Sequence, residues 1–129
     1  MESALWKNIA LVAAGGALGS VARFLVARAF EHCECGSFPW ATFVVNVLGC
    51  LLIGLFSALS SRGGFFSDDL RLLLTVGLCG GFTTFSTFMN ENSALLRDGQ
   101  WLMMGLYVAA SVLLGFLAVG IGLRIGEHL

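Results

Sequence analysis

The sequence contains few charged residues. Only 12% of its 129 residues are Asp, Glu, Lys or Arg, whereas soluble domains average about a quarter. Hydrophobic residues make up 57% of the chain, and the mean hydropathy is +0.89. Charge is missing altogether from four stretches, residues 8–22, 35–61, 72–90 and 99–123. This lack of charge argues against a soluble domain and favours lipid as the solvent of most side chains.

The uncharged stretches predict four transmembrane helices. A spanning helix needs roughly 20 apolar residues, and the last three stretches reach 19 or more. The first is shorter, but it continues as "FLVARAF" beyond Arg23. We therefore expect an all-α integral membrane protein with one transmembrane domain, residues 1–129, in which almost nothing is left for a soluble domain. The predicted helices lie near 8–30, 39–60, 70–96 and 101–124.

No clear cleavage site follows the first apolar stretch. Lys7 and the small residues after it are also features of a signal peptide, whose apolar region runs about 7–15 residues and ends at an A-x-A-like site. Here the apolar character continues past Arg23 without such a site. We therefore favour a retained helix over a cleaved signal peptide.

The four cysteines lack the spacing of a structural zinc site. Cys50 and Cys79 fall in predicted helices, where small apolar packing residues are the simplest interpretation. The "HCEC" segment gathers three possible ligand types at His32, Cys33, Glu34 and Cys35. Its C-x-C spacing has no second half-site of the kind that structural zinc needs. A solvated loop is the favoured interpretation.

The positive charges show almost no bias between the two sides of the membrane. With four spans, four fall on the side of the termini and three at or towards the other side. The first group is Lys7, Arg62, Arg71 and Arg124, and the second is Arg23, Arg28 and Arg97. Lys/Arg bias sets orientation, so this chain could insert either way round. Such a chain can form an antiparallel dimer from a single sequence.

The first predicted helix carries small residues and one arginine. Gly15 and Gly19 are four residues apart, a spacing that allows close helix approach in lipid. Arg23 lies seven residues from the predicted end of the helix. It could extend its charge to the membrane surface or line an aqueous vestibule, because intramembrane charges are usually functional.

The second and fourth predicted helices each carry a polar face. Thr42 and Asn46 share a face at i and i+4, as do Tyr107 and Ser111. The Asn46 amide needs partners in a dry environment. It could bond a neighbouring helix or donate into a polar path, and Tyr107 could likewise be a buried, satisfied hydroxyl or part of that path.

The third apolar run contains "GLCGGFTTFSTFMNEN", residues 77–92, in which glycines and hydroxyls interrupt the helix pattern. The Gly80-Gly81 pair is poor helix-forming sequence. A break at this depth frees backbone carbonyls, which is tolerated only where protein or water satisfies them. Freed carbonyls can hold a cation near the membrane midplane. If two antiparallel subunits meet here, two carbonyls from each predict a four-oxygen cage.

Two faces follow the predicted break. Phe85 and Phe88 lie three residues apart, as core residues often do, but ring edges are partly positive and could face an anion. The other face is formed by Thr84, Thr87 and Glu91, which we call the polar strip. The strip predicts a line of polar groups running to one end of the membrane.

Three motifs resemble the Fluc family of fluoride channels, also called CrcB. They are "GGALGSVARF" (15–24), "FVVNVLGC" (43–50) and "GLCGGFTTFSTFMNE" (77–91). The third is highly specific, and all four predicted spans line up with those of the family. The resemblance implies an antiparallel, dual-topology homodimer in the cell inner membrane, with two pores that pass fluoride passively and no nucleic-acid partner.

The resemblance also implies roles for individual residues. Arg23 matches the family's helix-1 arginine, which we assign to the vestibule, and the carbonyls of Gly80 and Thr83 match the site of a structural sodium ion at the dimer centre. The "EHCECG" loop matches no family role. The implied fluoride pore comprises Asn46, Phe85, Phe88, Thr42, Thr84, Thr87, Glu91, Tyr107 and Ser111.

Two other functions compete with this interpretation. A small multidrug-resistance-type exporter needs an acidic residue in the middle of its first helix, and residues 8–30 contain none. A membrane subunit without transport of its own would use the break and the polar faces for packing. An enzyme is not expected, because no nucleophile, base and orienting group converge in the pattern. The residues alone predict a polar, anion-friendly route; fluoride comes from the resemblance.

Overall fold

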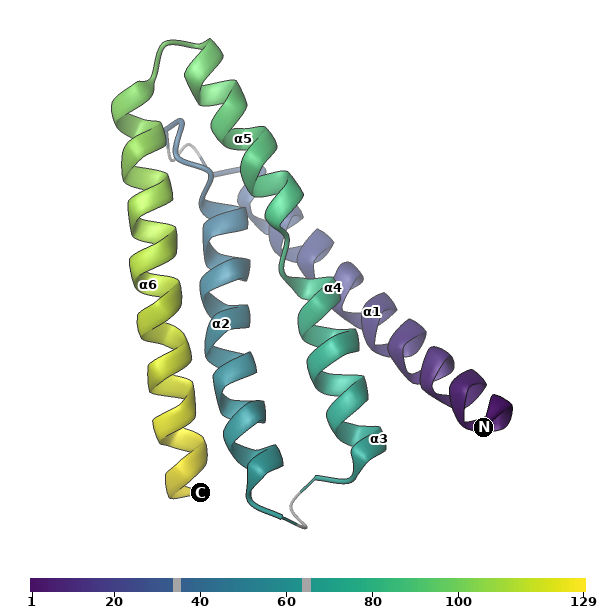
Figure 1. Ribbon diagram of the computed structural model, residues 1–129. Helices are drawn as coiled ribbons and strands as arrows, with labels where there is room; N and C mark the ends of the chain where they lie inside the picture. The colour runs from purple at the N-terminus through teal and green to yellow at the C-terminus, as the bar shows by residue number, and fades with distance from the viewer. Residues whose placement is uncertain (34–35, 64–65) are drawn as a thin grey trace.

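The computed structural model describes residues 1–33, 36–63 and 66–129, and the regular structure in these ranges is helical (Figure 1). α1 (Glu2–Phe30), α2 (Trp40–Ser61) and α6 (Trp101–His128) are continuous. Together with Asp68–Arg97 they give four segments long and apolar enough to cross a membrane. The predicted all-α class and its four spans are confirmed. α1 begins earlier than predicted, and Glu2 in its first turn favours that start.

The third segment is not one regular helix. It begins as α3 (Asp68–Arg71), continues as the π-helical η1 (Leu72–Cys79) and the short α4 (Gly80–Phe82), and resumes as α5 (Phe85–Arg97). Between α4 and α5 the backbone is extended, with φ −91° and ψ 158° at Thr83 and φ −151° and ψ 120° at Thr84. Two residues in the interior of this segment, Thr83 and Thr84, therefore lack the helical conformation (Figure 1). We call them the interruption.

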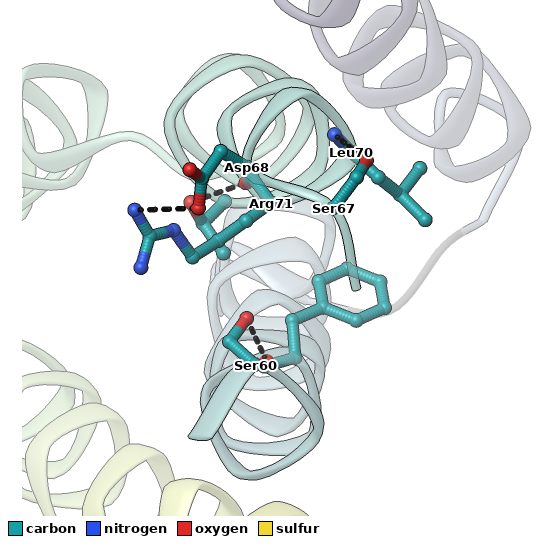
Figure 2. Close-up of polar contacts among 7 residues, drawn as sticks. Ser60, Ser67, Asp68, Leu70 and Arg71 are labelled. Carbon is teal, nitrogen blue, oxygen red and sulfur yellow. Dashed lines mark hydrogen bonds and ion pairs between the residues drawn. The ribbon is translucent and has the colours of Figure 1, made fainter. Parts of the chain in front are cut away.

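Local polar contacts stabilise the ends of α2 and α3 (Figure 2). Ser67 caps α3, because its Oγ accepts a 3.1 Å hydrogen bond from Leu70 N. Asp68, in the first turn, lies 3.7 Å from Arg71, and Ser60 Oγ donates to a carbonyl one turn earlier in α2. An N-cap of this kind contributes about 1 kcal/mol. The third segment therefore has a defined start at the membrane surface.

The four segments alternate in direction. Figure 1 shows both termini and the connection between α2 and α3 at one end of the molecule. The last turn of α1, the start of α2 and the turn between α5 and α6 lie towards the opposite end. This arrangement agrees with the division of positive charges predicted for four spans.

Glycines bring helix backbones into direct contact. A Cβ added at Gly54 of α2 would lie 2.3 Å from Val119 O, and one at Gly122 of α6 would lie 2.2 Å from Leu51 O. No real side chain fits at those distances, so α2 and α6 approach as closely as their backbones allow. Small residues at membrane helix interfaces permit such packing.

α1 packs against η1 and α4 in the same manner. A Cβ at Gly15 would lie 2.4 Å from Leu73 O, and one at Gly19 would lie 2.2 Å from Leu78 O. The close approach predicted at these two glycines is confirmed. It holds α1 beside the first half of the third segment.

Large apolar side chains cover the outside of the molecule. Phe116 is 84% exposed and Leu102 79% exposed, both on α6. In water such a surface would be costly, at roughly 25 cal/mol per Å², whereas in a bilayer it meets acyl chains. The chain is a multi-pass membrane protein.

Candidate functional site

A cavity of about 460 Å³ lies where α2, α6 and the interrupted third segment meet. Seven residues predicted from the sequence line it, and they come from α2, both halves of the third segment and α6. We call it the central cavity. These seven residues are Asn46, Gly80, Thr83, Thr84, Phe85, Phe88 and Ser111.

Asn46 holds the extended backbone at the edge of the central cavity. Its Nδ2 donates to Thr84 O at 3.1 Å, and its Oδ1 accepts from Thr84 N at 2.8 Å. One amide thus satisfies both backbone groups of a residue that has left the helix, as a dry environment requires. The second hydrogen on Nδ2 is not used in this pair of bonds. Of the two predicted roles, the bond to a neighbouring segment is present in the structure.

Arg23 of α1 bonds the backbone of α4, just before the extended residues Thr83 and Thr84. Its Nε donates to Gly81 O at 3.1 Å, and its side chain is partly buried. The sequence predicts the membrane surface or a vestibule for this side chain, and it does not predict this bond. A signal was available in the sequence, because Arg23 lies one helical turn beyond Gly19, where a close helix contact is predicted.

The threonines at the interruption stabilise both helix ends. Thr83 Oγ1 donates to Cys79 O at 2.9 Å and so closes the end of α4. Thr84 Oγ1 accepts from Thr87 N at 3.3 Å and caps α5. An N-cap such as Thr84 contributes about 1 kcal/mol. Thr84 therefore begins the polar strip and also defines the start of the helix that carries it.

The far end of the polar strip is a cluster of three side chains from three segments. Thr42 Oγ1 donates to Glu91 Oε2 at 2.9 Å, and Tyr107 OH donates to Glu91 Oε1 at 2.8 Å. Thr42 is 7% exposed and Tyr107 is fully buried. We call this group the carboxylate cluster. The sequence predicts a role for each of the three residues, but it does not predict that they meet.

The two phenylalanines of the predicted pore differ in burial. Phe85 is 73% exposed and Phe88 is 7% exposed, although their ring centroids lie 6.1 Å apart. Phe88 packs edge-on against Tyr107, with centroids 4.9 Å apart, and shares a core cluster with Leu95. Phe88 is thus part of the core as well as of the cavity lining, while Phe85 borders the cavity from its open side.

Two buried polar atoms have no hydrogen-bond partner among the described residues. They are Ser111 Oγ, on the wall of the central cavity, and Asn92 Oδ1. Asn92 donates from Nδ2 to Phe88 O at 2.9 Å. Asn92 is not among the residues predicted from the sequence, although it follows Phe88 by one helical turn. Ser111 Oγ is therefore a buried hydroxyl without a described partner at the wall of the central cavity.

A second, smaller cavity of about 220 Å³ opens at the end of the molecule beyond Glu91. It lies between the last turn of α1, the following connection and the start of α2. Phe30, Glu31, Phe38 and Glu91 are among the described residues that line it. We call it the end cavity. The two ends of the polar strip thus lie at two cavities: Thr84 lines the central cavity and Glu91 lines the end cavity.

The cysteines among the described residues do not form a metal centre. Glu34 and Cys35 of the "HCEC" segment lie outside the described residues. Within 1–33, 36–63 and 66–129, no three His, Cys, Asp or Glu side chains are placed to hold a metal ion. Cys50 and Cys79 are free thiols inside the bundle, as packing residues would be.

Comparison with known proteins gives the same family as the three sequence motifs. The sequence profile described as "CrcB-like protein, Camphor Resistance (CrcB)" matches residues 10–123. A protein of Phocaeicola vulgatus named fluoride-specific ion channel FluC is 47% identical over 121 residues, covering 94% of this chain and 99% of its own length. A protein of the same name from Chlorobaculum tepidum is 56% identical over 106 residues, covering 82% and 83%. A third, from Flavobacterium psychrophilum, is 46% identical over 123 residues, covering 95% and 99%.

These matches also bear on the expected class of protein. The relatives are named as ion channels rather than enzymes, in agreement with the prediction that no catalytic group is assembled here. The profile covers all but the two ends of the chain, and it includes the three motifs and most of each of the four spans. The chain therefore belongs to the CrcB-like family.

Proposed function

We propose that the chain is a fluoride-selective ion channel that exports fluoride passively across the cell inner membrane and so lowers cytoplasmic fluoride. The observation that carries the proposal is the polar strip, whose two ends lie at the central cavity and the end cavity. The names of relatives 46–56% identical to this chain support fluoride as the ion.

The chemistry of the route suits a small, strongly hydrated anion. Fluoride is the smallest halide and the costliest to dehydrate, so a pore for it must offer donors in succession. Ser111 has a hydroxyl without a partner among the described residues, and Asn46 has one amide hydrogen beyond its bond to Thr84. The ring edges of Phe85 and Phe88 add partial positive charge without a formal cation. Thr84, Thr87 and the carboxylate cluster extend the route to the end cavity.

The proposed assembly is an antiparallel homodimer with two pores, in which the third helix of each subunit is broken at its centre. The extended backbone of Thr83 and Thr84 supports the break. The even charge distribution supports dual topology. Phe85 is 73% exposed beside the central cavity, and a second copy over this opening would complete the walls. Reporter fusions at the C-terminus should detect both orientations, and a single orientation would contradict the antiparallel arrangement.

We further propose that the carbonyls of Gly80 and Thr83 hold a structural sodium ion at the dimer centre. Both residues line the central cavity, and a Cβ built at Gly80 meets no described atom within 4 Å. Carbonyl oxygens are the ligands that hard cations prefer, so these residues fit such an ion. When bound, the ion supplies a positive charge that offsets carbonyl dipoles brought together from two subunits. Replacing sodium by a bulky organic cation should lower the melting temperature of the purified dimer; equal melting temperatures would contradict the site.

Fluoride efflux from liposomes tests the proposed function. Vesicles that contain the purified protein are loaded with potassium fluoride and diluted into fluoride-free medium, and a fluoride electrode records release after a potassium ionophore is added. We expect release far above that from protein-free vesicles, and little chloride release from vesicles loaded with chloride. Release equal to the protein-free control would favour a subunit without transport of its own.

A further inference from the structure

Among the described residues, two carboxylates in different surroundings border the end cavity. Glu91, at its inner side, already accepts hydrogen bonds from Thr42 and Tyr107. Glu31, at the end of α1, lies 3.5 Å from Arg28 Nε through its Oε2. Both members of this pair are solvent-exposed, at 60% for Arg28 and 54% for Glu31. The outer carboxylate thus has a cationic partner, and the inner one has two hydroxyl donors.

A carboxylate at the end cavity without a cationic partner would repel the fluoride that is proposed to pass there. A cavity at the mouth of an ion path focuses the field of the charges on its walls. In water, a unit charge about 6 Å from the path changes the local population of a monovalent anion about threefold. Glu31 alone would therefore deplete fluoride at the entrance, and a cation beside it would cancel most of that effect.

We propose that Arg28 neutralises Glu31 and thereby keeps the end cavity accessible to anions. This inference rests on the proposed function. It gives Arg28 a positioning role, in which it acts on fluoride entry through the charge of Glu31. The Arg28–Glu31 pair should have little effect on the stability of the fold, because exposed ion pairs contribute little to it.

A double-mutant cycle tests the pairing. We would measure fluoride conductance of wild type, Arg28→Gln, Glu31→Gln and the double variant in planar bilayers, at ionic strengths near 0.01 M and 1 M. At low salt we expect Arg28→Gln to reduce conductance about threefold and Glu31→Gln to raise it by a similar factor. The double variant should return to the wild-type value. At high salt, where the screening length is about 3 Å, the differences should largely disappear.

The pair formed by Lys7 and Asp69 provides a matched control. These side chains lie 3.3 Å apart and are 59% and 50% exposed, but neither lines the central or the end cavity. Lys7→Gln and Asp69→Asn change the same net charge and should leave conductance near that of wild type. Arg28→Lys preserves the charge beside Glu31, so it should also conduct like wild type. Size-exclusion profiles of all variants should match, because every change is on an exposed side chain.

Three outcomes would overturn the inference in different ways. If wild-type protein carries no fluoride, the proposed function fails and this inference fails with it. If wild type conducts but Arg28→Gln matches Lys7→Gln, the inference alone is wrong. If the double variant stays as low as Arg28→Gln, Arg28 attracts the anion directly and the pairing with Glu31 has no role.

Discussion

The α2–α6 pair and the interruption in the third segment are held in place by different kinds of contact. Between α2 and α6, glycines let one backbone rest against the other, as Gly54 does at Val119 O. At the interruption, polar side chains reach backbone groups instead, Asn46 to Thr84 and Arg23 to Gly81. The first contact depends on shape, and the second depends on hydrogen bonds in addition to glycine contacts such as that of Gly19 with Leu78 O.

This difference follows from the solvent. Lipid gives two apolar helices no hydrophobic reason to associate, so close packing has to hold them. A segment that leaves the helix exposes N–H and C=O groups, which are costly in lipid unless protein groups satisfy them. The side chains that satisfy them then lie beside a cavity. We therefore expect substitutions in the helix pair to change mainly stability, and substitutions at the interruption to change mainly conduction.

The largest effect is expected for Asn46→Asp. The carboxylate can still accept from Thr84 N, but it places a negative oxygen against Thr84 O, where Nδ2 now donates. It also puts an uncompensated charge on the wall of an anion route. At an effective dielectric constant of about 20, two like unit charges about 4 Å apart repel by about 4 kcal/mol, so fluoride efflux should fall by about a hundredfold or more. Efflux from liposomes, normalised to the amount of dimer, measures this.

Asn46→Ser sharpens the first prediction. It keeps a neutral donor but is too short to span both backbone groups of Thr84, so an intermediate efflux is expected. Near-normal efflux for Asn46→Asp would remove this side chain from the ion route.

The next largest effect is expected for Gly122→Ala in the helix pair. A Cβ there would lie 2.2 Å from Leu51 O, a rigid backbone atom. Overpacking of this kind costs about 1–3 kcal/mol, so the melting temperature of the purified protein should fall. Gly120→Ala is the matched control, because a Cβ at Gly120 meets no described atom within 4 Å. Equal melting temperatures for the two variants would contradict the close packing of α2 and α6.

Much of the fold could be predicted because membrane spans are local in sequence. Each uncharged run gave one segment, and the spacing of Gly15 and Gly19 predicted a close helix contact that is present. The glycines and threonines near residue 80 drew attention to the interior of the third segment. The sequence could not predict the extent of α1, because its exposed first turns are not set by hydrophobic length.

The contacts of the site were harder to predict because they join residues far apart in the chain. Thr42 and Glu91 are separated by 49 positions and Arg23 and Gly81 by 58. Periodicity assigns a residue to a helix face, but it does not say which other face lies opposite. Thr42 was therefore placed beside Asn46, its neighbour on the helix, when its hydroxyl in fact bonds Glu91.

Substitutions of Phe85 and Phe88 test whether one region both stabilises the fold and lines the ion route. Phe88→Ile should lower the melting temperature by removing an edge contact to Tyr107, which is worth about 0.5–1.5 kcal/mol. Phe85→Ile alters a side chain that is 73% exposed in the single subunit, so its main effect should be a lower efflux per dimer. Melting curves and efflux measured on both variants separate the two effects. Equal losses in both measurements would mean that the two rings have the same role.

The smallest effect is expected for Tyr107→Phe in the carboxylate cluster. The change removes one hydroxyl, which donates to Glu91 Oε1 at 2.8 Å, and leaves the ring and its contact with Phe88 in place. Hydrogen bonds between membrane helices average about 0.6 kcal/mol, so the melting temperature should fall only slightly. Thr42→Val is the companion variant, because it removes the other donor to the same carboxylate while keeping its shape.

If the cluster belongs to the ion route, each of these variants should reduce efflux more than it reduces stability, since a bare carboxylate at the end of the polar strip repels an anion. The double variant Tyr107→Phe with Thr42→Val should then lose more efflux than either single change. Because both donors act on one carboxylate, the two losses should not simply add. If efflux instead falls only in proportion to the loss of melting temperature in the two single variants and the double variant, the carboxylate cluster stabilises the fold and is not part of the ion route.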